Sequence, residues 1–276
     1  MIEEISLKFS NDSIVVIKSS ECMEIIAIAN QKGGVGKTTT AVNLTASLAA
    51  KRKRVLLIDL DPQGNATTGT GLDKNNLDLT ITDVFLNEAS LQEAIVESPA
   101  GFDVIGANRE LAGMDITLMA ETNSHEFLKK AMQKLVSEQQ TPYDYIVMDC
   151  APSLNLLTIN ALVATEGVII PMQCEYYALE GLADLSQTIE RLKELNPKLY
   201  IRGVVRTLFD ARNTLANDVS DELEEHFGDI MYHTCIPRNI RLAEAPAHGL
   251  PVIAYERWSK GARSYLKLAA EVIKQS

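Results

Sequence analysis

The chain has 276 residues, of which 46% are hydrophobic and 23% are charged. These proportions exclude collagen-like, disordered and membrane-embedded chains. Aspartate and glutamate number 37 against 26 lysines and arginines, and the net charge of −11 argues against a surface that is basic all over, while leaving room for a local basic patch. Glu3 and Glu4 stand where a secretory signal carries positive charge, and no apolar run reaches the roughly 18 residues of a membrane span, so we expect a cytoplasmic protein.

Residues 1–22 precede the regular part of the chain. Two short apolar runs at 5–9 and 14–17 predict an edge hairpin or strand. A second interpretation stays open, in which Met23 is the biological start and residues 1–22 are an extension that carries no chemistry.

From residue 23 onward, apolar β-branched runs alternate with segments of helical period. The predicted strands are 25–29, 55–59, 102–106, 145–149, 167–171, 200–205 and 231–235. The predicted helices are 37–50, 124–138, 154–164, 178–195, 213–226 and 261–274. This alternation predicts one α/β domain over residues 23–276, with a mainly parallel sheet flanked by helices.

Four cysteines are spread along the chain at Cys22, Cys150, Cys174 and Cys235. They form no CxxC pair and lie in mostly apolar stretches, so we expect small buried thiols and neither a disulfide framework nor a zinc site.

A glycine-rich loop follows the first strand of the domain and precedes a helix, the order that a phosphate-binding loop requires. Its glycines let backbone N–H groups close around phosphate oxygens at the positive end of the helix. Lys37 is expected to reach the β and γ phosphates, and the Thr38 hydroxyl to ligate Mg²⁺. The residues expected at a bound nucleotide are Lys32, Gly33, Gly34, Val35, Gly36, Lys37, Thr38 and Thr39.

The loop departs from the usual spacing at its entrance. Gln31 stands where the first glycine belongs, and Lys32 adds a second lysine. A lysine or arginine side chain supplied by a second subunit can stabilise the charge that develops in phosphoryl transfer, and Lys32 is a candidate for this role. The alternative is that Lys32 is simply a solvated loop residue.

Three carboxylates come at or just after the ends of predicted strands. Asp59 and Asp61 close one apolar strand, and Asp149 closes another. The carboxyl ends of parallel strands form the ligand crevice of an open α/β sheet, and P-loop proteins hold Mg²⁺ or its water ligands from such an aspartate. A single strand-end aspartate can equally cap the next helix, but three beside a phosphate loop favour a magnesium site built from Thr38, Asp59 and Asp149.

These motifs resemble those of the ParA/Soj family of deviant Walker A ATPases. Members of this family partition plasmids and chromosomes and are related to the MinD-type ATPases. The strings that carry the resemblance span residues 23–275 and include KGGVGKTT at 32–39, DLDPQGN at 59–65, YDYIVMDCAPS at 143–153, EYYALEG at 175–181 and IPRNIRLAEAP at 236–246.

The resemblance implies a P-loop ATPase that binds ATP and Mg²⁺ and dimerises around the nucleotide. It implies that Lys32 contacts phosphate across the dimer, that Lys37 serves phosphate within its own chain, and that Asp61 positions the attacking water. It further implies that Asp59 lies near Mg²⁺ and that Asp149 is the Walker B carboxylate. Two segments, 206–210 and 236–239, fall where such proteins hold the adenine, and the second contains Pro237 and Arg238.

The same resemblance implies binding of double-stranded DNA without sequence preference, release of DNA upon hydrolysis, a ParB-like partner and association with the nucleoid. Residues 200–263 hold eight lysines and arginines against nine acidic residues, six of which crowd one predicted helix and its end. We therefore expect DNA contacts from Arg212, Arg238 and Arg241, with scattered solvated arginines as the alternative.

The main rival is a MinD-like positioning ATPase that acts on a surface or cargo other than DNA. It would need a C-terminal amphipathic targeting helix, whereas residues 264–274 have the pattern of a helix that packs on the domain, so we expect no membrane partner. A nitrogenase-iron-protein-like reductase would need cluster-ligating cysteines, and a metabolic kinase would need a substrate pocket of its own; the sequence indicates neither.

Overall fold

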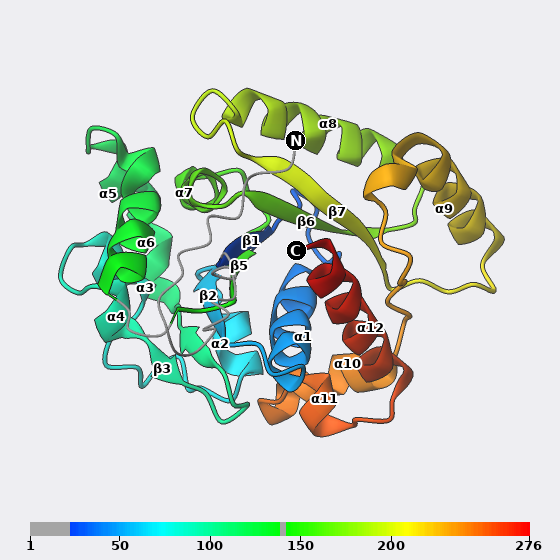
Figure 1. Ribbon diagram of the computed structural model, residues 1–276, viewed down its shortest axis with the longest axis horizontal. Helices are drawn as coiled ribbons and strands as arrows, with labels where there is room; N and C mark the ends of the chain where they lie inside the picture. Colours follow the sequence, from blue (N-terminus) through cyan, green and yellow to red (C-terminus); the bar gives the residue numbers. More distant parts are fainter. Residues whose placement is uncertain (1–22, 139–141) are drawn as a thin grey trace, which may run out of the picture.

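The computed structural model describes residues 23–138 and 142–276, so the hairpin predicted within residues 1–22 lies outside the described residues. Within those ranges a seven-stranded sheet has the order β3-β4-β2-β5-β1-β6-β7 (Figure 1). The strands are β1 Glu24–Ile28, β2 Val55–Leu60, β3 Val96–Glu97, β4 Asp103–Ile105, β5 Tyr145–Cys150, β6 Gly167–Gln173 and β7 Tyr200–Thr207. All neighbours pair in parallel except β3 with β4, which confirms the mainly parallel sheet.

Helices cover both faces of this sheet (Figure 1). The α-helices are α1 Lys37–Ala50, α2 Asn65–Gly69, α3 Ile81–Phe85, α4 Leu91–Ala94, α5 Met114–Met119, α6 Phe127–Glu138, α7 Leu156–Ala164, α8 Ala178–Leu192, α9 Thr214–Phe227, α10 Ile240–Glu244, α11 Val252–Tyr255 and α12 Lys260–Gln275. Helices α1 and α12 lie on one side of the sheet, and α7 and α8 lie on the other.

The apolar core is divided in two by the sheet because successive side chains of a strand point to opposite faces. In β2, Leu56 and Ile58 belong to the core under α6, α7 and α8, while Leu57 belongs to the core under α1 and α12. Every residue of β2 is buried. The central strands therefore appear in the sequence as continuous apolar runs, and their carboxyl ends form one edge of the sheet.

The strand predicted at 231–235 is wrong. Only Met231 bridges β7, through Val204. The N–H of Tyr232 still donates to the carbonyl of Val204 at 2.9 Å, but those of His233 and Thr234 donate to the carboxylate of Glu271 on α12, at 2.8 and 3.0 Å. Because a helix side chain takes these donors, the ladder beside β7 is interrupted until the N–H of Ile236 donates to the carbonyl of Arg206 at 2.8 Å.

The short helices between residues 65 and 119 were not predicted from hydrophobic period. Two of them carry a local signature, the capping box. In this motif the N-cap hydroxyl accepts a hydrogen bond from the backbone of the first turn, and an acidic side chain three residues later accepts one from the N-cap backbone N–H. Thr80 pairs in this way with Asp83 at the start of α3, and Ser90 with Glu93 at the start of α4. Each helix has five residues or fewer, too short for a period to appear.

Candidate functional site

The glycine loop joins the carboxyl end of β1 to the first residue of α1. Gly34 and Gly36 have φ of 74° and 85°, a left-handed conformation that other residues rarely adopt. A Cβ added at Gly33 or Gly34 would meet no atom within 4 Å, so the concave side of the loop is open. The loop is anchored from β7, because the Thr207 hydroxyl donates to the carbonyl of Val35 at 2.7 Å. A glycine loop anchored in this way can turn its backbone N–H groups toward an anion.

Lys37 is buried inside the loop. Its ammonium donates to the carbonyl of Lys32 at 2.9 Å, which closes the loop on itself. Burial lowers the pKa of Lys37, and the nearby carboxylate of Asp149 partly offsets this effect. A desolvated ammonium that bonds only weakly to a neutral carbonyl is ready to exchange it for a phosphate oxygen. Thr38 and Thr39 follow at the half-buried start of α1.

Lys32 lies at the mouth of the loop, with about half of its side chain exposed. Its ammonium forms an ion pair of 2.5 Å with Glu175, which comes between β6 and α8 of the same chain. The single chain therefore holds Lys32 across the mouth of the loop. The sequence around Glu175 indicates no role for this residue, because no local pattern reveals a contact between residues 143 positions apart.

Asp59 and Asp149 come together as the sequence predicted, directly paired on the neighbouring strands β2 and β5. Both are fully buried, but their surroundings differ. Asp59 accepts hydrogen bonds from the backbone N–H and hydroxyl of Thr67, each at 2.8 Å, and from the N–H of Asp61 at 3.1 Å. Burial nevertheless raises the pKa of Asp59 to about 6.

Asp149 lacks such support. Neither of its carboxylate oxygens accepts a hydrogen bond of ordinary geometry from a described residue, and the Thr38 hydroxyl is near enough only to lower its pKa. Burial, followed by the charge of Asp59, raises the pKa of Asp149 well above its usual value, while Thr38 and Lys37 lower it. A buried carboxylate without partners is costly unless a cation joins it.

The residues present fit a magnesium ion. Asp149 offers unpartnered oxygens, and Thr38 offers a hydroxyl on the adjacent turn of α1. Asp59 accepts hydrogen bonds from Thr67 and from the backbone of Asp61, which connect it to the turn that begins α2, and its place beside the cation stays a prediction. Within residues 23–138 and 142–276 no group of three His, Cys, Asp or Glu side chains could hold a metal by itself. Mg²⁺ suits this arrangement because it keeps several waters and binds through few carboxylates plus substrate phosphates.

Asp61 lies just beyond the end of β2 and is partly exposed. Its carboxylate accepts the backbone N–H of Gln63 at 2.9 Å, which fixes its direction. Its charge also reaches Lys37 and Asp149, so it belongs to the same electrostatic cluster. The structure thus brings together Lys37, Asp59, Asp61 and Asp149.

A cavity of about 410 Å³ opens beside the loop. Its lining includes Thr207 and Leu208 from one segment and Pro237 and Arg238 from the other, the two segments where the resemblance places the adenine. It also includes Tyr265, which the sequence does not indicate. Leu208 has φ of 50°, a costly conformation for such a residue and one that concentrates at ligand sites. Main-chain bonds from Phe209 to Ile236 (3.0 Å) and from Arg238 to Phe209 (3.1 Å) hold the two walls together.

The arginines predicted to contact DNA lie in different surroundings. Arg212 is exposed but makes two bonds to Asp210, at 2.9 and 2.7 Å. Arg241 forms an ion pair with Glu244 at 2.7 Å. Arg238 is exposed at the lip of the cavity. Whether these three contact DNA stays a prediction.

Two arginines counted in the basic region 200–263 are not surface residues. Arg202 is buried in an ion pair with Glu24 and donates to the carbonyl of Val272 at 2.8 Å. Arg206 is buried against Ser220 and Glu224 of α9, both at 2.8 Å. The count of eight basic residues therefore overstated the basic surface by two.

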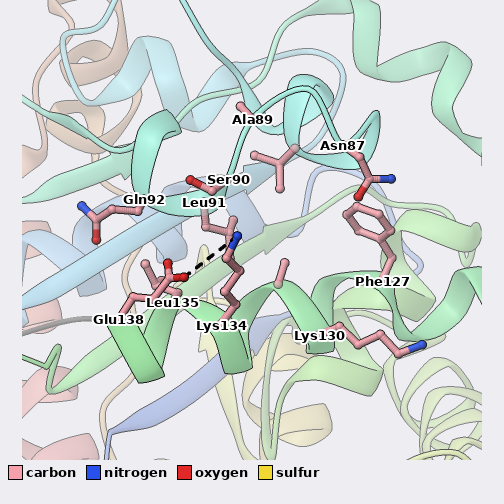
Figure 2. Close-up of a pocket in the computed structure, with 12 residues that line it drawn as sticks. Asn87, Ala89, Ser90, Leu91, Gln92, Phe127, Lys130, Lys134, Leu135 and Glu138 are labelled. Carbon is pink, nitrogen blue, oxygen red and sulfur yellow. Dashed lines mark ion pairs between the residues drawn. The ribbon is translucent and has the colours of Figure 1, made fainter.

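A second cavity, of about 280 Å³, lies between α4 and α6 (Figure 2). Figure 2 shows Leu91 and Leu135 at its floor and Lys134 reaching Glu138, an ion pair of 4.0 Å. This cavity has no glycine loop and no paired buried acids, so it carries none of the chemistry of the first one. The described part of the chain contains no helix that is both long and apolar enough to span a bilayer.

Comparison with known proteins shows which family the chain is similar to. A family model described as an AAA domain matches residues 23–201. The chromosome partitioning protein ParA of Caulobacter vibrioides is 48% identical over 257 residues, which cover 92% of this chain and 96% of the relative. The sporulation initiation inhibitor protein Soj of Bacillus subtilis is 50% identical over 251 residues, which cover 90% of this chain and 98% of the relative.

A solved structure has the same fold. Cobyrinic acid a,c-diamide synthase from Mycobacterium smegmatis, with bound ADP and magnesium, superposes with a TM-score of 0.79 at 34% identity and covers 92% of this chain and 95% of its own. With the glycine loop, its second lysine and the paired strand-end acids in place, these similarities show that the chain belongs to the ParA/Soj family of chromosome-partitioning P-loop ATPases.

Proposed function

We propose that this protein is an ATP-driven switch that partitions DNA, hydrolysing ATP to ADP and phosphate and binding duplex DNA in one nucleotide state. One observation carries the ATPase assignment: a buried lysine and a buried carboxylate without partners lie under an open glycine loop. Such an arrangement costs stability in the free protein and is offset when a nucleotide and its cation bind.

Different residues of the chain bind the phosphates, hold the cation and position the attacking water. The loop N–H groups and Lys37 bind the phosphates, and Thr38 and Asp149 hold the cation. Bound Mg²⁺ would neutralise charge that develops on the transferring phosphoryl group. Asp61, fixed by the N–H of Gln63, orients the attacking water. No strong general base is evident among these residues, so we expect slow turnover.

Lys32 makes the site dependent on a second copy. In one chain Lys32 is held by Glu175 at 2.5 Å, beside the loop that Lys37 already serves. We propose that ATP draws two copies together and that Lys32 then leaves Glu175 to contact phosphate across the dimer. The exchange costs little, because a salt bridge half exposed to solvent contributes only about 0–1 kcal/mol.

Dimerisation would convert the nucleotide state into affinity for DNA. Two weak basic surfaces on one rigid dimer bind a duplex far better than one surface does. Arg212, Arg238 and Arg241 are the proposed contacts, and they would meet phosphates without reading the bases. A ParB-like partner would stimulate hydrolysis and so release DNA, which places the protein on the nucleoid while ATP is bound.

A MinD-like ATPase that acts on another surface is the second candidate, and less supports it. Helix α12 buries Ala262, Tyr265, Leu268 and Val272 against the domain, so it has no free apolar face with which to lie on a bilayer.

The substitution Asp61→Ala tests the catalytic assignment. We expect it to leave the affinity for a fluorescent ATP analogue unchanged and to abolish ATP hydrolysis, so that the dimer accumulates in light scattering with ATP. Asp78→Ala is the matched control, because Asp78 is exposed on a nearby loop. Hydrolysis of ATP by Asp61→Ala at the parental rate would show that Asp61 does not position the attacking water.

A further inference from the structure

A groove of about 720 Å³ opens at the amino ends of β1 and β6, at the opposite edge of the sheet from the glycine loop. Its apolar lining comes from the start of β1, from α6, from the end of α7 and from the segment before β7, and it consists mainly of Met23, Ile25, Met132, Val136, Val163 and Pro197. No described residue lines both this groove and the nucleotide cavity, so its occupant is a separate question.

The groove leaves part of the apolar core uncovered. Ile26 and the next two residues of β1 are fully buried, as expected for a central strand covered on both faces. Met23 and Ile25 pack on the core under α6 and α7 but are only half-buried. Val136 on α6 lines the same groove and is 44% exposed. Apolar surface gathered in this way indicates a contact site.

Hydrogen bonds hold the floor of the groove in one shape. The Thr165 hydroxyl donates to the carbonyl of Ile25 at 2.5 Å, which joins the end of α7 to β1. The buried amide of Asn196 donates to the carbonyls of Leu162 and Thr165, at 3.1 and 2.5 Å, which joins the segment before β7 to α7. A groove that is already ordered loses little entropy when an apolar segment binds to it.

The chain itself carries an apolar segment close to this groove. Met23 is the first described residue and lines the groove, and 22 residues of the sequence precede it. Residues 14–17 are Ile-Val-Val-Ile, and only residues 18–22, KSSEC, separate them from Met23. Six residues span at most about 20–22 Å, so Ile17 stays near the groove. A tether this short gives the segment an effective concentration on the order of millimolar.

Charge favours the same occupant. The charged residues in the lining are Lys129, Lys198 and Glu166, which carry a net positive charge. Residues 1–22 carry a net negative charge, because they contain four acidic residues and two lysines. The electrostatic attraction between them therefore adds to the burial of apolar surface.

We propose that residues 1–22 fold back onto this groove and that residues 14–17 cover Ile25 and Val136. Residues 1–22 are then part of the fold, in contrast to the interpretation in which the protein begins at Met23. The same segment of a second copy has the same chemistry, but the short tether favours docking within one chain at low protein concentration. Because the nucleotide site lies at the other edge of the sheet, docking should stabilise the domain and leave the affinity for nucleotide unchanged.

Hydrogen–deuterium exchange of the full chain without nucleotide tests this docking. At both a low and a high protein concentration, the amides of residues 14–17 should exchange at least about tenfold more slowly than in an unstructured chain. Val136→Asp should remove this protection, because it places a charge in the groove. Ile116→Asp is the matched control, since Ile116 is 78% exposed on α5 and does not line the groove.

A double-mutant cycle on thermal unfolding gives a second measurement. Ile17→Asp and Val136→Asp should each lower the midpoint of unfolding of the full chain, and the double variant should unfold near the less stable of the two. The cost of an aspartate within α6 is common to both arms of the cycle and cancels.

Exchange of residues 14–17 at the rate of an unstructured chain would overturn the proposal. Protection seen only at the higher concentration would also overturn it, because the segment would then dock on a second copy. Protection that survives Val136→Asp would exclude this groove, and additive shifts in the cycle would exclude the contact between Ile17 and Val136. Neither experiment contains ATP or DNA, so its outcome is independent of the proposed function.

Discussion

The two lysines of the glycine loop show how environment divides roles between identical side chains. Lys37 is buried and bonded to the carbonyl of Lys32, whereas Lys32 is half exposed and paired with Glu175. A buried cation serves a ligand that enters its own loop, and an exposed one can leave a weak salt bridge for a ligand held elsewhere.

We therefore expect Lys37→Ala to abolish nucleotide binding, because the phosphates lose the ammonium inside the loop. Lys32→Ala should keep most of the nucleotide affinity and lose ATP-driven dimerisation. Binding of a fluorescent nucleotide measures the first effect, and light scattering with ATP measures the second. A Lys32→Ala protein that dimerises like the parent would remove the role in trans.

Asp149 shows the cost of a prepared cation site. Its pKa is raised in the folded protein, so the fold favours the protonated carboxyl. The folded state then binds more protons than the unfolded state above the ordinary carboxyl pKa, and stability falls as pH rises through that window. At neutral pH the buried negative charge of Asp149 therefore lowers the stability of the nucleotide-free protein, a cost that is common at residues needed for function.

The substitution Asp149→Asn should therefore raise the midpoint of thermal unfolding of the nucleotide-free protein at pH 8. The gain should shrink toward pH 4, where the parental carboxyl is protonated in the fold. Calorimetry at several pH values checks this, with loss of magnesium-dependent nucleotide binding as the companion result. A lower midpoint for Asp149→Asn at pH 8 would contradict the account.

At the scale of elements, the sequence predicted what local patterns determine. Helix 37–50 was predicted with the bounds of α1, and Asp59 and Asp149 meet because parallel strands end at one edge. Contacts between distant segments could not be predicted. Glu271 takes the backbone donors of His233 and Thr234 from 38 and 37 positions away. Helices α3 and α4 were missed for a different reason, because they are too short to show a hydrophobic period.

The segment that was wrongly predicted as a strand still packs tightly on the sheet. Its Tyr232 ring lies over Gly203 of β7, where an added Cβ would come within 2.4 Å of the ring. Tyr232 is almost fully buried, so it has no room to retreat. Glycine is thus required at position 203 by the close approach of an aromatic ring.

Gly203→Ala should lower the unfolding free energy by about 1–3 kcal/mol through overpacking, measured by urea denaturation. Gly181→Ala is the control, because Gly181 lies in α8 with no atom within 4 Å of an added Cβ and should gain about 0.5–1 kcal/mol. Equal stability of Gly203→Ala and the parent would show that Tyr232 moves freely.

At the scale of the whole molecule, the protein is acidic and yet is proposed to bind DNA. The net charge of −11 opposes contact with a polyanion, so binding has to depend on where the few free cations lie. Within residues 200–263, Arg238, Arg257, Lys260 and Arg263 are exposed, and Arg238 lines the nucleotide cavity. A dimer would present two such surfaces to one duplex, which makes affinity depend on the nucleotide.

The most direct test of this account is a gel shift on two unrelated duplexes, with ATP or ADP in the presence of Mg²⁺, at low and moderate salt. We predict equal binding to both sequences with ATP, far weaker binding with ADP, and a loss of affinity as salt rises because phosphate contacts release counterions. Binding that is the same with ATP and ADP, or that strongly prefers one sequence, would contradict it.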